Sequence, residues 1–267
     1  DTDRSRGLGD VYKRQNLMNT YFIHTIELYR LITYSEFTSL NIGLRRFGNN
    51  NEYRCLEYEK DGITILFRIC TDNEKKKKGN KYGYKLIVIF NPSRLIENNT
   101  YINRIWNADV FVSSISLFNE KLKFIFENII PDISGIDDFV LSRIDITKDI
   151  SAIPENVIQE YIKTIRRFPL KYGYSLNTQL EENCPAFKYE NSVNIINKSS
   201  EIEFVLYNKH QATIDQKYPD EIQNYYANTL RMELRCGRKF IKKNTKNLDV
   251  FYSLIYFFIY KESMVKD

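Results

Sequence analysis

The sequence predicts an α+β fold in which a large antiparallel sheet has its helices packed on one face. Several short runs rich in β-branched and aromatic residues alternate with period two, as half-buried strands do. Other segments repeat apolar residues at three- and four-residue spacing, which indicates amphipathic helices. Strands followed by a helix occur in both halves, so we expect two similar sheet-plus-helix halves, although no sequence repeat relates them.

The first half is mostly strand and ends in a long helix. A loop with four consecutive lysines, at 75–78, precedes one of its strands, and we interpret this loop as a solvated hairpin tip rather than a DNA contact. Asp109 is a candidate N-cap at the start of the helix. The predicted strands are 21–30, 52–59, 63–70 and 82–90, and the predicted helix is 109–129.

The second half repeats this mixture of strands and helices. Pro154 is placed for the first turn of a helix, where its fixed backbone angle is tolerated. A polar segment at 220–227 is a further helix candidate. The predicted strands are 139–150, 201–209 and 229–236, and the other predicted helices are 154–168 and 249–260.

The composition is that of a globular protein with a mildly basic surface. Hydrophobic residues make up 43% and charged residues 27% of the 267 positions, which excludes a disordered chain. The net charge of +5 and the aromatic fraction of 14% are compatible with nucleic-acid binding without requiring it. The four cysteines are widely spaced, so we expect reduced thiols rather than a zinc site or a disulfide framework.

The bounds of the native chain also follow from the sequence. Residues 1–15 resemble the in-frame translation of a sequencing adapter, and we exclude them from the native protein. We expect the native chain to begin at Met18 and to form a single domain over residues 18–267, and we leave open whether it is complete or truncated at its C-terminal end. No apolar segment is long enough to span a membrane and no signal peptide follows Met18, so we expect a cytoplasmic protein without a membrane partner.

Three of the predicted strands carry a polar face. Side chains of a strand point alternately to its two faces, so the charged residues of each of these strands share one face. If the three strands belong to one sheet, that face collects two carboxylates, a tyrosine, a lysine and three arginines. The members are Asp145, Glu233, Tyr207, Lys209, Arg143, Arg231 and Arg235.

These side chains have a use in phosphodiester chemistry. Carboxylates such as Asp145 and Glu233 are ligands that Mg²⁺ or Mn²⁺ prefers, and such a metal can polarise a phosphodiester. The hydroxyl of Tyr207, with a reference pKa of about 10, needs help to attack phosphorus at neutral pH. We expect Lys209, two residues further along the same face, to stabilise the phenolate or the transition state.

A structural interpretation of the same face stays open. The charges alternate in sign along the strands, so they can form cross-strand ion pairs on an exposed sheet face. Tyr207 is one of 20 tyrosines, and a tyrosine on a strand usually packs against its neighbours. We also favour packing over base stacking for Tyr225 and Tyr226.

Three motifs in these strands occur in a recognisable order. They are Ser142-Arg-Ile-Asp145, Tyr207-x-Lys-His210 and Leu230-Arg-x-Glu-x-Arg235, and a strand with a proline-containing turn precedes them at 85–95. In order and spacing they resemble the gene II replication initiators of filamentous phages, and they are similar to the Rep initiators of rolling-circle plasmids. The resemblance covers roughly residues 82–243.

The resemblance implies a metal-dependent, site- and strand-specific DNA endonuclease that also religates DNA. In that family, the tyrosine that matches Tyr207 attacks a phosphodiester at the replication origin, which leaves a 5′-phosphotyrosyl bond and a free 3′-OH. Asp145 and Glu233 would hold Mg²⁺ or Mn²⁺, with Lys209 beside the nucleophile. The expected partners are single- or double-stranded DNA at an origin and, as a further candidate, a host helicase. Arg143, Arg231 and Arg235 would bind the DNA.

Two departures from the family pattern keep other functions open. Gln211 and the residues after it replace an acidic residue that follows Lys-His in the family. His24 and His210 are the only histidines, so the His-hydrophobic-His metal motif of other rolling-circle nucleases is missing and a metal would depend on carboxylates. The first departure favours a non-catalytic DNA-binding protein with the same fold. A structural protein with an ion-paired sheet face is the third candidate.

Overall fold

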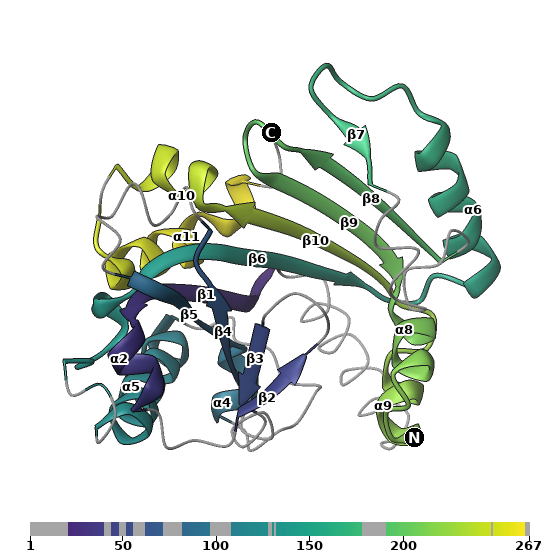
Figure 1. Cartoon of the computed structure of the whole chain (residues 1–267). Coiled ribbons are helices and arrows are strands. Elements are labelled where there is room, and N and C mark those ends of the chain that lie inside the picture. The colour runs from purple at the N-terminus through teal and green to yellow at the C-terminus, as the bar shows by residue number, and fades with distance from the viewer. Residues whose placement is uncertain are drawn as a thin grey trace. The chain divides into compact units, whose positions relative to one another are not determined.

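The computed structural model describes most of the chain between residues 21 and 264. The described residues are 21–39, 44–47, 52–55, 62–71, 82–96, 108–127, 130, 132–177, 191–246 and 248–264. Within them, ten strands lie in the order β2-β3-β4-β5-β1-β6-β10-β9-β8-β7, and helices occur between them (Figure 1). The predicted α+β class with a large antiparallel sheet is confirmed.

The chain divides into two compact units that share strand β6 (Val140–Ile150). The first unit contains residues 145–240 together with the ends of the chain, and the second contains residues 23–144 and 241–260. Each unit combines strands with helices, but the boundary lies inside β6 and not after the long helix, where we expected it. The single domain over residues 18–267 stays a prediction.

The second unit has the strand order β2-β3-β4-β5-β1 and ends with the first residues of β6. Strand β5 lies between β1 and β4 and pairs antiparallel with both. Its strands are β1 (Phe22–Thr33), β2 (Leu44–Phe47), β3 (Glu52–Cys55), β4 (Ile63–Ile69) and β5 (Tyr82–Phe90). Its helices are α2 (Tyr34–Thr38), α4 (Pro92–Ile96), α5 (Ala108–Phe126), the short η2 (Ile136–Asp138) and α11 (Val250–Met264).

Helix α5 provides much of the core of the second unit. Of the apolar residues that predicted this helix, those that the structure describes are buried, as their three- and four-residue spacing requires: Phe111, Ile115, Phe118, Leu122 and Ile125. Phe118 stacks on Phe90 of β5, with ring centroids 3.8 Å apart, and Phe111 stacks on Phe258 of α11 at 4.6 Å. The helix begins at Ala108, so Asp109 lies in its first turn and the prediction that Asp109 is the N-cap is wrong.

The first unit has the strand order β6-β10-β9-β8-β7. Strand β9 pairs antiparallel with β10 on one side and with β8 on the other. The strands other than β6 are β7 (Ser175–Leu176), β8 (Ser192–Asn197), β9 (Ile202–Asn208) and β10 (Leu230–Gly237). The helices are α6 (Glu155–Arg167), α8 (Lys209–Asp215) and α9 (Asp220–Tyr225), and α10 (Arg238–Thr245) follows β10.

Helix α6 covers the apolar face of the first unit's sheet. Ile158 and Ile162 of α6 pack with Val193, Leu206 and Leu230 from β8, β9 and β10. Each isoleucine is fully buried, which contributes about 1.5–3 kcal/mol to stability. Because the apolar residues of the strands face α6, their polar residues occupy the opposite face.

Helix α8 lies on that opposite face, which corrects the prediction that all helices share one face. Ala212 of α8 packs against Val205 and Tyr207 of β9. The strand predicted to reach residue 209 ends at Asn208, whose side-chain oxygen accepts a hydrogen bond from the backbone N–H of Gln211 at 3.1 Å and caps α8. Other elements that the sequence patterns did not predict are α2, β2, α4, β7, β8 and α10.

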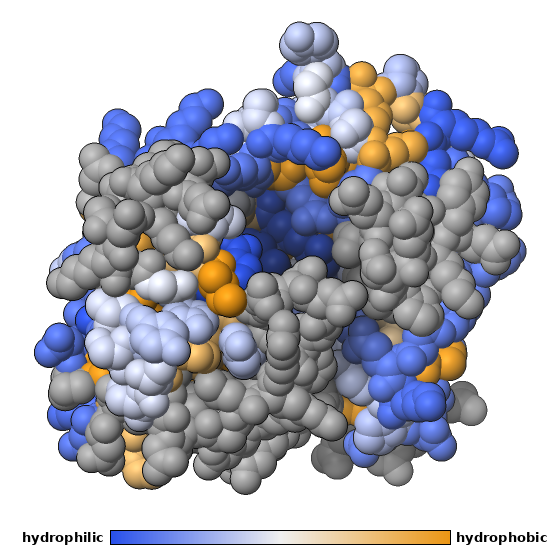
Figure 2. Space-filling model, in the orientation of Figure 1, coloured by the Kyte–Doolittle hydropathy of each residue, from blue (hydrophilic) through white to orange (hydrophobic). Residues whose placement is uncertain are grey.

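The remaining expectations concern the cysteines, the membrane and the surface. Cys70 and Cys236 are buried thiols that form no disulfide, as predicted, whereas the lysine loop at 75–78, Cys184 and the side chain of Cys55 lie outside the described residues. Among the described helices, none is long and apolar enough to cross a bilayer. Figure 2 shows a largely hydrophilic face, with apolar side chains gathered at the sheet edge around β7.

Candidate active site

Strands β9 and β10 align the predicted catalytic residues on the polar face of the first unit. In the antiparallel register, Arg231 lies opposite Tyr207, and Glu233 lies opposite Val205. Residues two positions apart on one strand share a face, so Tyr207 and Glu233 are diagonal neighbours on the same surface. The predicted common face of Tyr207, Arg231 and Glu233 is therefore confirmed.

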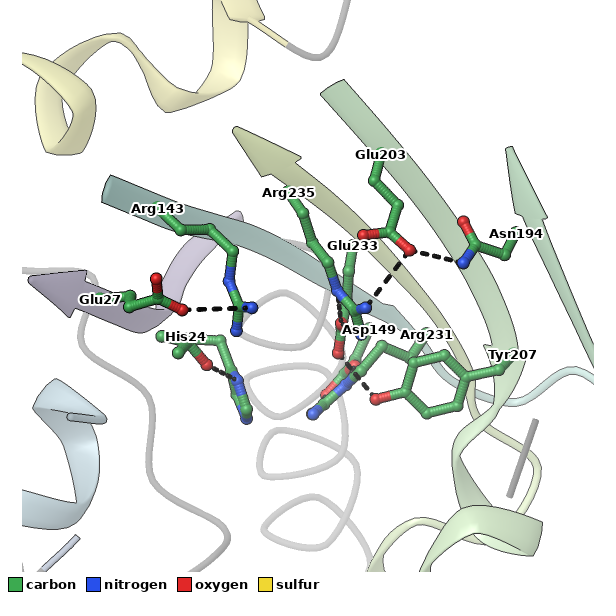
Figure 3. Close-up of polar contacts among 11 residues, drawn as sticks. His24, Glu27, Arg143, Asp149, Asn194, Glu203, Tyr207, Arg231, Glu233 and Arg235 are labelled. Carbon is green, nitrogen blue, oxygen red and sulfur yellow. Dashed lines mark hydrogen bonds and ion pairs between the residues drawn. The ribbon is translucent and has the colours of Figure 1, made fainter. Parts of the chain in front are cut away.

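Tyr207 and Glu233 form a direct hydrogen bond on this face. The Tyr207 hydroxyl donates to Oε1 of Glu233 at 2.7 Å, and Figure 3 shows the two side chains pointing toward each other from neighbouring strands. Tyr207 is 5% exposed and Glu233 4%. Burial and then the negative charge of Glu233 raise the pKa of Tyr207 well above its ordinary value, although the Arg231 guanidinium opposes this shift. The phenol is therefore protonated at neutral pH.

Arg231 is held by a buried ion pair. Its Nε donates to Oδ1 of Asp149 at 2.5 Å and its Nη2 donates to Oδ2 at 2.7 Å, a bidentate geometry. The two side chains are 2% and 0% exposed. Burial alone would lower the pKa of Arg231, but the charge of Asp149, its hydrogen bonds and the interactions with Tyr207 and Tyr226 together raise that pKa well above its ordinary value. In this position Arg231 is inside the protein, and its predicted contact with DNA stays a prediction.

Arg235 bridges two carboxylates at the more open end of the face. Its Nη2 and Nε donate to Oε2 of Glu233 at 3.1 and 3.3 Å, and its Nη1 lies 3.5 Å from Oε1 of Glu203 (Figure 3). Burial would lower the pKa of Arg235, but the charges of Glu233, Asp145 and Glu203 outweigh it and raise the pKa. Asp145 is 3% exposed and lies on β6, the strand next to β10, and its negative charge is one of those that raise the pKa of Arg235.

Lys209 lies one residue beyond the end of β9, although the predicted strand included it, and its predicted role beside the phenolate stays a prediction. It is the first residue of α8, because Asn208 ends β9 and begins the helix. Lys209 is 8% exposed, and its Nζ lies 5.1 Å from the ring centroid of Tyr226. The Arg231 guanidinium carbon lies 5.4 Å from the same ring. The buried Tyr226 thus packs against two cations, as the preference for packing over base stacking predicted.

Arg143 belongs to the second unit. Its Nη1 lies 3.6 Å from Oε2 of Glu27 on β1, and Ser142 beside it donates a hydrogen bond to the same glutamate at 2.7 Å. The side chain of Arg143 is 36% exposed. The described contacts of Arg143 are thus those of a sheet-surface ion pair, and its predicted contact with DNA stays a prediction.

The side chains of His210 and Asn208 contact Glu155 at the start of α6. His210 Nδ1 lies 2.9 Å from Oε1 of Glu155, the first residue of α6, and the amide of Asn208 donates to the other oxygen of Glu155. The same glutamate lies near the backbone N–H of Asn228. A carboxylate in the first turn of a helix is also favoured by the helix dipole. His210 therefore has a structural partner, and a role as a metal ligand is not needed to explain its position.

Comparison with known proteins assigns the chain to no family. No protein family model matches it, and no curated protein matches it significantly. The polar face must therefore be interpreted from its own geometry. That geometry places a buried phenol in contact with a carboxylate, beside two arginines whose charges can stabilise negative charge on oxygen.

The predicted metal ligand Glu233 is already engaged by other protein groups. Within the described ranges, no group of three His, Cys, Asp or Glu side chains is placed to hold a metal ion. Both oxygens of Glu233 already accept hydrogen bonds, one from Tyr207 and the other from Arg235. A cation that shares Asp145 and Glu233 would first have to displace Arg235 from the cluster. The Mg²⁺ or Mn²⁺ site at these carboxylates stays a prediction.

The sequence reasoning missed Asp149, Glu155 and Asn194. Asp149 continues the alternation of Asp145 and Thr147 along β6, so the period-two pattern could have placed it on the polar face. Asn194 lies on β8, which was not predicted, and its amide donates to Glu203. The sequence marks Glu155 only as an acidic residue in the first turn of a helix, and this pattern does not predict which side chains it contacts.

Proposed function

We propose that this chain is a DNA nicking and strand-transfer enzyme of the rolling-circle initiator kind, with Tyr207 as its nucleophile. The observation that carries the proposal is the hydrogen bond from the Tyr207 hydroxyl to Glu233, on a face that also holds Arg231 and Arg235. A protonated phenol needs a proton acceptor in contact and positive charge nearby to attack phosphorus, and this cluster supplies both. The Rep-like fold, an origin as target and a host helicase as partner belong to the same proposal.

The reaction would join the phenol oxygen of Tyr207 to a DNA phosphorus and release a 3′-OH. Tyr207 is 5% exposed, so the DNA strand can reach it only after the covering residues move. Ala212 of α8 is one of these residues, since it packs against Tyr207. We therefore expect strand binding and displacement of α8 to precede the chemical step.

A binding experiment distinguishes this proposal from its alternatives. The purified chain is incubated with Mn²⁺ and a pool of single-stranded oligonucleotides of random sequence, and covalent protein–DNA adducts are separated on a denaturing gel. An adduct supports the nicking enzyme. Salt-dependent DNA binding without an adduct at any metal concentration indicates the non-catalytic DNA-binding protein, which the burial of Tyr207 also favours. The absence of DNA affinity at moderate salt indicates the structural protein.

The metal prediction has its own test at Asp145. Asp145→Ala is expected to abolish adduct formation together with its dependence on Mn²⁺, because it removes one of the two predicted ligands. The measurement is the adduct yield over a Mn²⁺ titration. Asp220→Ala, which removes an exposed carboxylate of α9, is the matched control and is expected to behave as the wild type. An active Asp145→Ala variant with a normal Mn²⁺ response would show that Asp145 is not a ligand.

A further inference from the structure

The carboxylate of Glu233 lies between the phenol and a guanidinium. Its Oε1 accepts the hydrogen bond from Tyr207 at 2.7 Å, and its Oε2 accepts two hydrogen bonds from Arg235 at 3.1 and 3.3 Å (Figure 3). Glu233 is 4% exposed, so its hydrogen-bond partners are provided mainly by the protein. Each carboxylate oxygen thus has a different partner, and these hydrogen bonds fix the orientation of the Glu233 carboxylate.

We propose that Glu233 is the proton acceptor for Tyr207 and that Arg235 positions it, in place of the metal-ligand role predicted from the sequence. This inference rests on the proposed nicking function. A general base must lie within hydrogen-bond reach of the proton that it removes, and Oε1 of Glu233 meets that condition without any rearrangement. The other oxygen, Oε2, accepts hydrogen bonds from the Arg235 guanidinium, so both oxygens of Glu233 are directed at protein groups.

The proton balance of the step is complete with these groups. As the phenol oxygen of Tyr207 forms its bond to phosphorus, its proton moves to Oε1 of Glu233, and the bond between phosphorus and the 3′ oxygen breaks. The 3′ oxygen leaves with the bonding electron pair and takes a proton from water. Religation reverses these changes: the 3′-OH gives its proton to hydroxide from the solvent, its oxygen attacks phosphorus, the bond to Tyr207 breaks, and Glu233 returns its proton to the phenolate.

Arg235 and Arg231 have different effects on this transfer. Arg235 holds Oε2, so Oε1 keeps its direction toward the phenol while the proton moves. Arg231 lies opposite Tyr207 on the neighbouring strand. Its positive charge favours the phenolate and lowers the pKa of Tyr207, whereas the charge of Glu233 raises that pKa. Because Asp149 fixes Arg231 in place, this positive charge stays near the oxygen on which negative charge develops.

The test is a kinetic comparison of Glu233→Gln with the wild-type chain. Glutamine has nearly the same shape and can still accept the Tyr207 hydrogen bond, but it cannot take up the proton. We expect the single-turnover rate of adduct formation to fall by about 10²–10⁴-fold, while the Mn²⁺ concentration for half-maximal rate stays unchanged. Glu203→Gln is the matched control, since Glu203 contacts Arg235 but not the phenol, and it should lose far less activity.

A second measurement reports on the pair without DNA. The alkaline absorbance titration of tyrosine is recorded for the wild type, Glu233→Gln and Tyr207→Phe, and the last identifies the contribution of Tyr207. Removal of the Glu233 charge is expected to lower the pKa of Tyr207. Circular dichroism confirms that each variant is folded.

The outcomes separate this inference from the proposed function. If the wild type forms no adduct with any oligonucleotide, the nicking function is wrong and the inference falls with it. If the wild type forms an adduct and Glu233→Gln forms it equally fast, nicking stands but Glu233 is not the base. A slow Glu233→Gln variant that regains its rate at high Mn²⁺ would make Glu233 a metal ligand, which also overturns the inference.

Discussion

Tyr207→Phe is expected to reduce the covalent protein–DNA adduct to the background level. The substitution removes the only atom of this side chain that can bond to phosphorus, while the ring that packs on Val205 and Ala212 is kept. It also removes a buried hydrogen bond to Glu233, so we expect a loss of about 1–3 kcal/mol in the free energy of unfolding. Adducts are measured on a denaturing gel, and stability is measured by urea unfolding.

The matched control for this variant is Tyr161→Phe. Tyr161 lies on α6 in the same unit and is 52% exposed, so its hydroxyl has no part in the buried face. This variant should form the adduct like the wild type. A normal adduct in Tyr207→Phe would assign the nucleophile to another tyrosine and refute the proposed site.

Asp149→Ala is expected to lower the free energy of unfolding by about 3–5 kcal/mol, because it leaves the Arg231 charge buried without its carboxylate. This loss of stability is larger than that expected for breaking a surface ion pair, since both side chains are almost fully buried. Urea unfolding followed by circular dichroism measures this loss. Glu203→Gln, which weakens a longer and partly exposed contact with Arg235, should cost less than about 1 kcal/mol.

A double variant tests the cause of this loss. Asp149→Leu combined with Arg231→Met removes both charges and keeps most of the side-chain volume, so it should recover much of the stability. A double variant that is as unstable as Asp149→Ala would show that the lost charge pair is not the cause. The folded double variant also tests the predicted role of Arg231 in DNA binding, because unchanged DNA affinity would exclude a direct contact.

The polar face could be predicted because it depends on local alternation. The period of two along three strands was enough to place Tyr207, Glu233 and Arg235 together, although their pairing as neighbours required strand order. The end of the strand was predicted one residue too late, at Lys209, because Asn208 caps the following helix through a side-chain hydrogen bond. A pattern of apolar residues does not detect such a cap, since the cap depends on a single polar atom.

The burial of Arg231 could not be predicted from its own strand. Its sequence neighbours on the same face are Glu233 and Arg235, which suggested a solvated row of charges. The carboxylate that neutralises it comes from β6, 82 positions earlier, and the rings of Phe22 and Tyr226 lie near its guanidinium. Only the tertiary structure brings these groups together, so the strand pattern predicted ion pairs on an exposed face, the family resemblance implied a DNA contact, and neither predicted a buried pair with Asp149.

The distance along the chain between Asp149 and Arg231 also has a consequence for the order of folding. Strands β8 and β9 form a short hairpin that closes between Asn197 and Ile202, whereas the ion pair closes a loop of 82 positions. Long loops cost more chain entropy to close, so we expect the hairpin to form in the folding transition state and the ion pair after it.

Val193→Ala should then slow folding, and Asp149→Asn should mainly speed unfolding. The opposite result in stopped-flow kinetics would reverse this order. A chain that has formed only this hairpin has Tyr207 in place without Glu233, so under the proposed function it would still lack the proton acceptor.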